Sequence, residues 1–214
     1  MKIIDCEQGS PQWHAARLGM VTASRMADVT AKTKAGWGAG RANYAAELIA
    51  ERLTGAAAER FTNAAMQWGT EQEPAARAMY EFMTGLPVVE VGAVLHPSIE
   101  MTLASPDGLV GDDGLVEVKC PNTATHIETL LGAAIDGKYI KQMQWQMACC
   151  ERQWCDFVSF DPRMPADMQI HIQRVHSDPV LIAELEQAAR VFLEDIITKV
   201  KELVAKYRAI EAAA

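Results

Sequence analysis

Three ionisable residues of one short segment, Asp107, Glu117 and Lys119, have types and spacing that could bind a cation and activate a water. Nine residues, including a tight turn at 111–114, separate the two acids, so a β-hairpin would bring them side by side. Glu117 and Lys119 share one face of the second strand, because side chains alternate along a strand. Two carboxylates at close range repel each other unless a proton or a cation lies between them.

A magnesium ion suits this pattern. Mg²⁺ takes one or two carboxylates together with waters and a substrate phosphate, and the backbone carbonyl of Val118 is a third candidate ligand. The ion would lower the pKa of an attacking water, and Lys119 would orient or deprotonate that water. A second interpretation stays open from these residues alone: a solvated hairpin with its charges on the wet face and a Pro-Asp-Gly turn.

The elements that must position these residues indicate one α/β domain over residues 1–214. Periodicity and stop signals predict helices, with the fourth disturbed at Pro74 and the fifth begun by a Thr125/Glu128 capping box. They cover 11–18, a second short helix capped by 22–24, 41–55, 63–84, 123–134, 139–150 and a long stretch from 179. Strands are expected at 87–95, 101–110, 115–120, 154–160 and 167–175, and residues 34–41 as a loop. This order indicates a mixed sheet of about five strands flanked by helices.

Composition bounds the class of protein. A chain of 214 residues with 50% hydrophobic content can bury a real core. It has no apolar run that would span a bilayer and no signal peptide at its start, so we expect a cytoplasmic protein. Five cysteines without a framework spacing indicate free thiols, and Cys149, Cys150 and Cys155 lack the spacing and histidines of a zinc site.

The net charge of −8 counts against a protein that holds nucleic acid with its whole surface. The same charge is compatible with carboxylates that bind a metal and with basic residues gathered in one groove. Charge alone therefore leaves both kinds of protein open.

Several segments occur together in a fixed order: QWHAARLGMVTAS, WGTEQEPAAR, SPDGL, EVKCP, KQMQWQM and FDPRM. Together they resemble the phage lambda exonuclease family, the phage-type alkaline exonucleases of the PD-(D/E)XK nuclease superfamily. The resemblance runs from about Trp13 to about Arg163. It implies a restriction-endonuclease-like PD-(D/E)XK core.

The resemblance also implies a function. The implied activity is that of a Mg²⁺-dependent 5′→3′ double-strand DNA exonuclease, with Mn²⁺ as a substitute ion. Such an enzyme releases 5′-mononucleotides and leaves a 3′ overhang for recombination. The expected partners are double-stranded DNA ends, a single-strand annealing protein and two further copies in a homotrimeric ring, inside the bacterial host of a phage or prophage. A structure-specific or restriction-type endonuclease on the same core and a non-catalytic DNA-binding module are the alternatives.

Residue roles follow from the same motifs. Asp107 and Glu117 match the family's metal ligands and Lys119 its catalytic lysine. Glu73 matches a helical acid that binds the metal or holds water, and the residue that follows it, Pro74, departs from the family pattern. Without the resemblance, the sequence would equally favour an exposed ion pair between Glu73 and Arg77, four residues apart on one helix.

Glutamines of the KQMQWQM segment complete the expected catalytic set. Gln142 matches the family's glutamine, whose amide would hold a water or the lysine. Tyr139 and Gln146 share its helical face by their spacing. For Gln144 and Gln146 we favour ordinary surface polarity.

A pocket for the 5′-phosphate of the digested strand is expected at Arg17, Ser24 and Ser105. Arginine offers two parallel donors to phosphate oxygens, and a hydroxyl at a helix N-terminus adds a donor where the helix dipole favours an anion. Taken alone, Arg17 would be a charge at a helix C-terminus and Ser24 a plain N-cap.

Overall fold

The structure is a computed structural model that describes residues 1–34, 36–57 and 63–208, so Ala35 of the predicted loop lies outside the described residues. A mixed five-stranded sheet lies at its centre. Its strands in spatial order are β11 (Ile170–His176), β10 (Trp154–Phe160), β9 (Gly114–Lys119), β8 (Gly108–Val110) and β5 (Val88–Val89). β9 and β10 run parallel and the other neighbours antiparallel. The predicted α/β fold with a mixed sheet of about five strands is confirmed.

A second, four-stranded sheet was not expected from the sequence. Its order is β1 (Lys2–Ile4), β6 (Ala93–Leu95), β7 (Thr102–Ala104) and β2 (Val21–Thr22). The predicted single strands 87–95 and 101–110 are therefore wrong, because each divides into two short strands in different sheets. Together they form one bent hairpin, in which β5 pairs with β8 and β6 with β7.

The bend of this hairpin is held by the N-terminal segment. The amide of Gln8 donates to the carbonyls of Val91 and Pro106, each at 2.8 Å, and so ties both arms together. Gly92 permits the close approach, since a Cβ there would lie 2.3 Å from the carbonyl oxygen of Cys6. Ser105 and Asp107 both lie in the bend, between the end of β7 and the start of β8.

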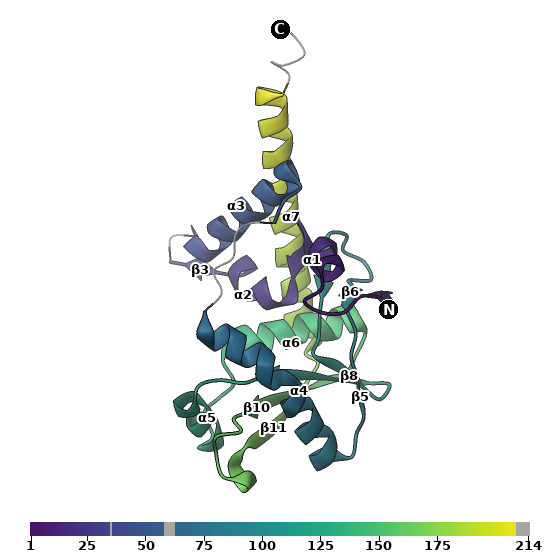
Figure 1. Cartoon of the computed structure of the whole chain (residues 1–214). Coiled ribbons are helices and arrows are strands. Elements are labelled where there is room, and N and C mark those ends of the chain that lie inside the picture. Colours follow the sequence, from purple (N-terminus) through teal and green to yellow (C-terminus); the bar gives the residue numbers. More distant parts are fainter. Residues whose placement is uncertain (35, 58–62, 209–214) are drawn as a thin grey trace.

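Helices surround the two sheets (Figure 1). They are α1 (Pro11–Arg17), α2 (Met26–Val29), α3 (Ala39–Thr54), α4 (Ala64–Thr84), α5 (Thr123–Leu130), α6 (Gly137–Cys150) and α7 (Pro179–Tyr207). Short 3₁₀ turns, η1 (Ala23–Arg25) and η2 (Ala166–Met168), and a small hairpin, β3 (Lys32–Thr33) and β4 (Gly36–Trp37), complete the described elements.

The structure corrects two predictions, one about the start of α5 and one about the interior of α4. α5 begins at Asn122, whose side chain accepts from the backbone N–H of Thr125 at 3.0 Å, so the predicted Thr125/Glu128 capping box is wrong. α4 is one continuous helix, although Pro74 has no N–H to donate to the preceding turn. Its predicted stop is confirmed, because Gly85 takes the left-handed conformation that ends the helix.

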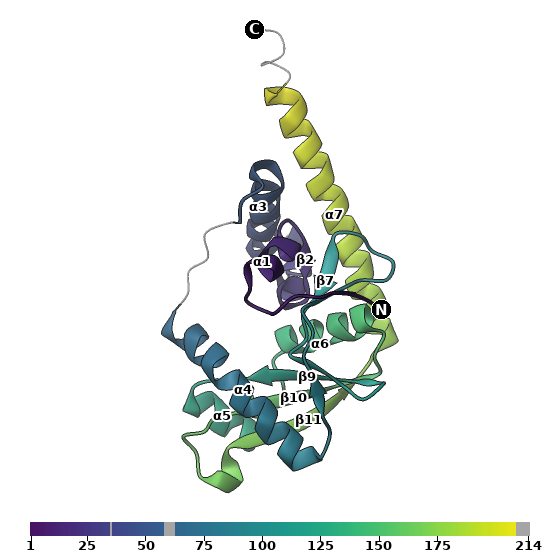
Figure 2. The ribbon, with the colours of Figure 1, turned by 45° about the vertical axis from the view of Figure 1, so that its right-hand side comes forward.

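The two faces of β9 meet different helices. Val116 and Val118 point toward α4 and pack with Ala76 and Tyr80 of that helix. Leu115 points to the other face, into the larger core that includes α6. Figure 2 shows α4 crossing in front of the sheet and α6 lying above it, between the sheet and the layer that contains α1 and β2.

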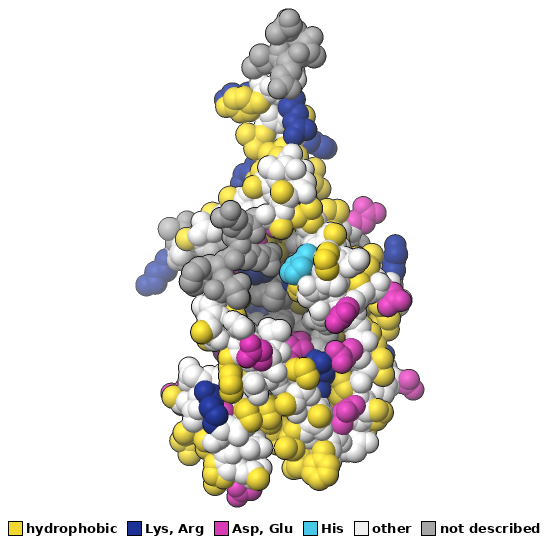
Figure 3. Space-filling view, viewed as in Figure 1, with side chains coloured by type: hydrophobic (Ala, Val, Ile, Leu, Met, Phe, Trp, Pro, Cys, Tyr) yellow, Lys and Arg dark blue, Asp and Glu magenta, His cyan; other side chains and the backbone are white. Residues whose placement is uncertain are grey.

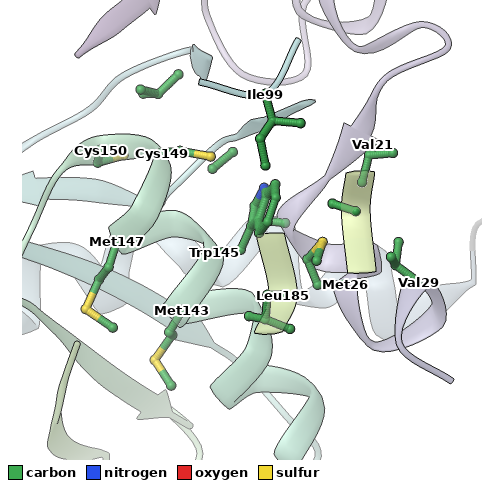
Figure 4. Packing of buried hydrophobic residues seen from close by; sticks show 14 of the residues in the cluster. Val21, Met26, Val29, Ile99, Met143, Trp145, Met147, Cys149, Cys150 and Leu185 are labelled. Carbon is green, nitrogen blue, oxygen red and sulfur yellow. The ribbon is translucent and has the colours of Figure 1, made fainter. Parts of the chain in front are cut away.

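α6 is consequently buried on both sides. Figure 4 shows Met143 and Met147 on one side of this helix and Trp145 on the other, where it lies near Ile99, Met26 and Leu185. A helix that is buried all round lies in the interior of its domain. Polar side chains on α6 must therefore find partners inside the protein.

The last long helix, α7, packs against α3 and α6 and then extends beyond the rest of the molecule (Figures 1 and 2). Near its end, the guanidinium of Arg208 donates to the carbonyl of Leu53 at 3.0 Å. None of the described helices combines the length and the apolar character needed to cross a membrane.

Candidate functional site

Glu117 lies in the middle of the five-stranded sheet and its residue is 0% exposed. Three donors satisfy its carboxylate: the ammonium of Lys119 and the amide of Gln142 bind Oε1, and the amide of Gln146 binds Oε2. A solvated hairpin with its charges on a wet face is excluded by this burial. A charge is retained in a protein interior only where such partners compensate for the lost water.

Asp107 approaches the same strand from the bend of the long hairpin. Its Oδ2 accepts the backbone N–H of Val118 at 2.6 Å, which places Asp107 beside β9 as the sequence predicted. Burial, followed by the nearby charge of Glu117, raises the pKa of Asp107 well above its usual range. Two carboxylates in this arrangement would be stabilised by a cation between them.

Lys119 is the cation that this structure places against the pair. Its ammonium binds Glu117 and lies 5.1 Å from the centre of the Tyr139 ring. Burial is the largest single influence and lowers the pKa of Lys119, but the charges of Glu117 and Asp107 and the hydrogen bond to Glu117 together outweigh it, so the net effect raises the pKa. Tyr139, which shares the helical face of Gln142, therefore borders the site.

The expectation of surface polarity for Gln144 and Gln146 is wrong. Both are buried, at 2% and 0% exposure, because α6 is enclosed between two layers. Gln146 Nε2 lies 2.5 Å from Glu117 Oε2, while Gln144 donates to the carbonyl of His176 and accepts from the backbone N–H of Asp178. The i,i+4 spacing of Gln142 and Gln146 was the sequence signal that they face the same strand.

Glu73 is held in an ion pair and lies close to the carboxylates. Its Oε1 accepts from Arg77 at 2.5 Å, and Arg77 also binds Glu90. Burial raises the pKa of Glu73, Arg77 opposes this effect, and the charge of Glu117 reinforces it. The predicted ion pair with Arg77 is present, and Glu73 also lines the cleft on the continuous helix α4, so its role as a ligand or water-holder stays a prediction.

An open cleft of about 920 Å³ leads to this cluster. Its walls come from the first turns of α4, the end of β9 and the start of α6. They include Trp68, Glu73, Lys119, Lys138, Tyr139 and Arg163. Three cations therefore line one cleft of a protein whose net charge is −8, an arrangement that the charge alone had left open.

The candidate ligands fit a hard divalent ion by their chemistry. Asp107, Glu117 and the Val118 carbonyl offer oxygen donors, and Mg²⁺ ordinarily takes only one or two carboxylates beside waters and phosphate. Within the part of the chain that the structure describes, no three His, Cys, Asp or Glu side chains are grouped closely enough to hold a metal. The oxygen donors present therefore fit a hard divalent ion, with Glu73 as a further donor nearby.

The predicted phosphate pocket is partly assembled. Arg17 Nη1 donates to the hydroxyl of Ser105 at 3.1 Å, so two residues that are 88 positions apart in the sequence lie together. Ser105 precedes Asp107 by two residues. Trp13 was missed as a partner: its indole N–H donates to Ser105 at 3.0 Å, and the Arg17 guanidinium lies 4.0 Å from the centre of its ring. Trp13 and Arg17 stand four residues apart on α1, which was the available signal.

Ser24 is exposed on η1, a turn that packs against β7, the strand that ends just before Ser105. Its hydroxyl lies 3.4 Å from that of Thr22. Thr22, rather than Ser24, occupies the N-cap position of η1, and makes no side-chain cap bond. The structure thus leaves the Ser24 hydroxyl at the surface on the Ser105 side of the molecule.

The Asp-Pro-Arg stretch after β10 closes one wall of the cleft. Asp161 is fully buried and binds the guanidinium of Arg163 through both oxygens, at 2.7 and 3.0 Å. Arg163 also donates to the carbonyl of Pro121 and lies 4.7 Å from the centre of the Trp68 ring. One arginine therefore joins the ends of β9 and β10 to α4, the helix that carries Glu73.

The order of these residues in the sequence matches a known domain. The model of the YqaJ-like viral recombinase domain matches residues 12–153, a segment that contains every candidate ligand named above. The chain belongs to this family. No curated protein sequence matches it.

Solved structures agree with this membership of the YqaJ-like family. Two structures of LHK-Exo, an alkaline exonuclease from Laribacter hongkongensis, one of them in complex with dAMP, are 54% identical with a TM-score of 0.88. The match covers 94% of this chain and 100% of that one. A phage-related exonuclease from Haemophilus somnus 129PT shares the fold at 16% identity and a TM-score of 0.67, over 86% of this chain and 96% of that one. The predicted resemblance to phage-type alkaline exonucleases is confirmed, and the chain is an enzyme of the nuclease class.

The cleft wall built on Asp161 makes a prediction about stability at low pH. Burial would raise the pKa of Asp161, but the bonds from Arg163 and Thr123 dominate and lower it to about 2. A carboxyl whose folded pKa is depressed stabilises the fold above its unfolded pKa of about 3.9 and loses that contribution as pH falls toward 2. Asp161→Asn should therefore lower the free energy of unfolding by about 2 kcal/mol at pH 7 and by much less near pH 2.

Urea denaturation at several pH values measures this difference. Asp167→Asn is the matched control, since Asp167 is exposed in η2 of the same loop. Equal losses of stability for the Asp161 variant at pH 7 and pH 2 would contradict the role given to its charge.

Proposed function

We propose that this chain is a Mg²⁺-dependent 5′→3′ exonuclease on double-stranded DNA, with Mn²⁺ as a substitute ion, that releases 5′-mononucleotides and leaves a 3′ single strand for recombination. The observation that carries the proposal is the cluster of Asp107, Glu117 and Lys119 at the end of β9, in which Glu117 is fully buried and Lys119 lines the cleft. The relation to LHK-Exo, an alkaline exonuclease that binds dAMP in one structure, supports a DNA substrate.

Each group of the cluster has a chemical part in this proposal. Asp107, Glu117 and the Val118 carbonyl would hold Mg²⁺, with Glu73 as a further ligand or water-holder, and the bound ion supplies an acidified water and positive charge beside the scissile phosphate. Lys119 orients or deprotonates the attacking water. Gln142, by its bond to Glu117 at 2.6 Å, keeps that carboxylate in place beside the lysine.

The direction of digestion rests on the phosphate pocket. Arg17 and the hydroxyl of Ser105 would bind a terminal 5′-phosphate, with Ser24 as an additional donor. Because Ser105 precedes Asp107 by two residues in the same bend, the end of the strand would be held next to the carboxylates. An endonuclease has no need of such a pocket, and this feature favours an exonuclease.

Removal of the charged groups should separate catalysis from folding. Asp107→Ala, Glu117→Ala and Lys119→Ala should each lower the release of acid-soluble nucleotides from linear duplex by about 10²–10³-fold or more, since each removes a group that handles charge in the transition state. Circular dichroism should show folded proteins. Near wild-type activity in any one of the three would show that its residue is outside the site, and activity that persists in EDTA would contradict metal dependence.

The phosphate pocket predicts a preference for the chemistry of the DNA end. Linear duplex with a 5′-phosphate should be digested faster than duplex with a 5′-hydroxyl, and Arg17→Ala should reduce the rate on the phosphorylated end by about 10- to 100-fold, the scale of a charge-assisted hydrogen bond.

Arg152→Ala is the control for this experiment, because Arg152 binds Gly111 at the opposite end of β9. Equal rates on both kinds of end in the unaltered protein, or cleavage of closed circular duplex, would favour the endonuclease alternative.

We further propose that the enzyme works as a homotrimeric ring with a single-strand annealing protein. A net charge of −8 opposes long-lived electrostatic binding to DNA, so long digestion would depend on enclosure of the strand. Apolar side chains are exposed where α4 ends, among them Phe82, Met83 and Val89, and Figure 3 shows hydrophobic side chains gathered on the lower part of that face. Exposed apolar patches of this kind are typical of protein interfaces.

Light scattering tests the ring. The expected mass in solution is three times that of one chain, and digestion should continue on engaged molecules after an excess of unlabelled DNA is added as a trap. A monomer that stops digesting at once on addition of the trap would contradict the ring and leave the proposed chemistry intact.

A further inference from the structure

Gln146 is the one residue bound to Glu117 to which neither the motifs nor the proposed reaction gives a role. Its side chain lies inside α6, 0% exposed, with Nε2 at 2.5 Å from Glu117 Oε2. A carboxylate only accepts hydrogen bonds, so the atom that faces it must be the amide nitrogen. Glu117 thereby dictates the orientation of the Gln146 amide.

This orientation leaves the other amide atom without a partner. Oε1 of Gln146 is buried and accepts no hydrogen bond from the residues that the structure describes. A buried polar atom without a partner destabilises a fold, and an apolar side chain of similar volume would avoid that loss. The unpaired Oε1 of Gln146 thus lowers the stability of the fold. Such a cost is typical of residues retained for function rather than for packing.

Two amides from successive turns of α6 together fix the carboxylate. Gln142 binds Oε1 and Gln146 binds Oε2, while Lys119 joins on the Oε1 side. Oε1 accepts two hydrogen bonds and Oε2 accepts one, so Oε2 keeps free lone-pair capacity while the plane of the carboxylate can no longer rotate. A ligand held in this way presents its oxygens to an ion in one direction.

We infer that Gln146 is a positioning residue for the Glu117 carboxylate and thereby sets the affinity of the site for a divalent cation. The inference rests on the proposed function, since it takes Glu117 as a ligand of Mg²⁺. Gln146 itself touches neither the ion nor the DNA. Its effect reaches the ion through the orientation of Glu117 alone.

The test measures Mg²⁺ binding and folding separately in the full-length protein without DNA. Gln146→Met keeps the volume and removes the donor, and Gln146→Asn keeps an amide that is one methylene too short to reach Glu117. Titration calorimetry with MgCl₂ should give a dissociation constant about 10- to 100-fold higher for both variants, the usual effect of losing a partner of a metal ligand. Gln146→Met in EDTA should stay folded, with a melting temperature near that of the unaltered protein, because loss of a donor to the buried Glu117 destabilises the fold and removal of the unpaired Oε1 stabilises it.

Gln144→Met is the matched control on the same helix. Gln144 is also buried, but both of its amide atoms are paired at 2.8 Å, with His176 and Asp178, which tie β11 and α7 to α6. This variant should melt at a lower temperature and bind Mg²⁺ as the unaltered protein does.

The outcomes are distinguishable. Wild-type Mg²⁺ affinity in a folded Gln146→Met variant would overturn the inference while leaving the proposed nuclease in place. Loss of folding in both Gln146 variants would also overturn it, by showing a structural role. If the unaltered protein binds no Mg²⁺, or binds it equally after Glu117→Ala, the assumed metal site and the inference fail together.

Discussion

The burial of one carboxylate, that of Glu117, is the constraint on which the arrangement of this protein depends. A charge in the centre of a sheet is stable only with close partners, and here the partners come from β9 itself and from two successive turns of α6. This requirement fixes how α6 lies across the sheet. It also brings Lys119 and Asp107 to the same place, the open end of β9 that faces the cleft.

The position of α6 has a second consequence, because the helix lies between the sheet and the layer of α1, α2 and the smaller sheet (Figure 2). One side of α6 supplies amides to Glu117, and the other packs Trp145 into the larger core. The carboxylate cluster and the main core thus share one rigid element, which suits a site whose groups must be held without freedom. Gln144 ties the same helix to β11 and α7.

The bent hairpin connects the residues of the proposed phosphate pocket to the carboxylates. Ser105 receives donors from Trp13 and Arg17 on α1, and Asp107, two residues later, binds β9. The bend exists because the two arms change sheets, and Gln8 ties the arms together at that point. In the proposed function, this one segment of backbone would therefore set the distance between the terminal phosphate and the scissile phosphate.

Local signals in the sequence determined the parts that depend on near neighbours: the alternation that puts Glu117 and Lys119 on one face of β9, the stop of α4 at Gly85, and the ordered motifs that identify the family. What the tertiary structure alone decided depends on contacts between distant segments. Gln144 and Gln146 carry polar side chains of a type that is usually exposed, and only the layers packed on both sides of α6 bury them. The meeting of Trp13 with Ser105, 92 positions away, likewise needs the second sheet, whose two- and three-residue strands are too short to leave a periodic pattern.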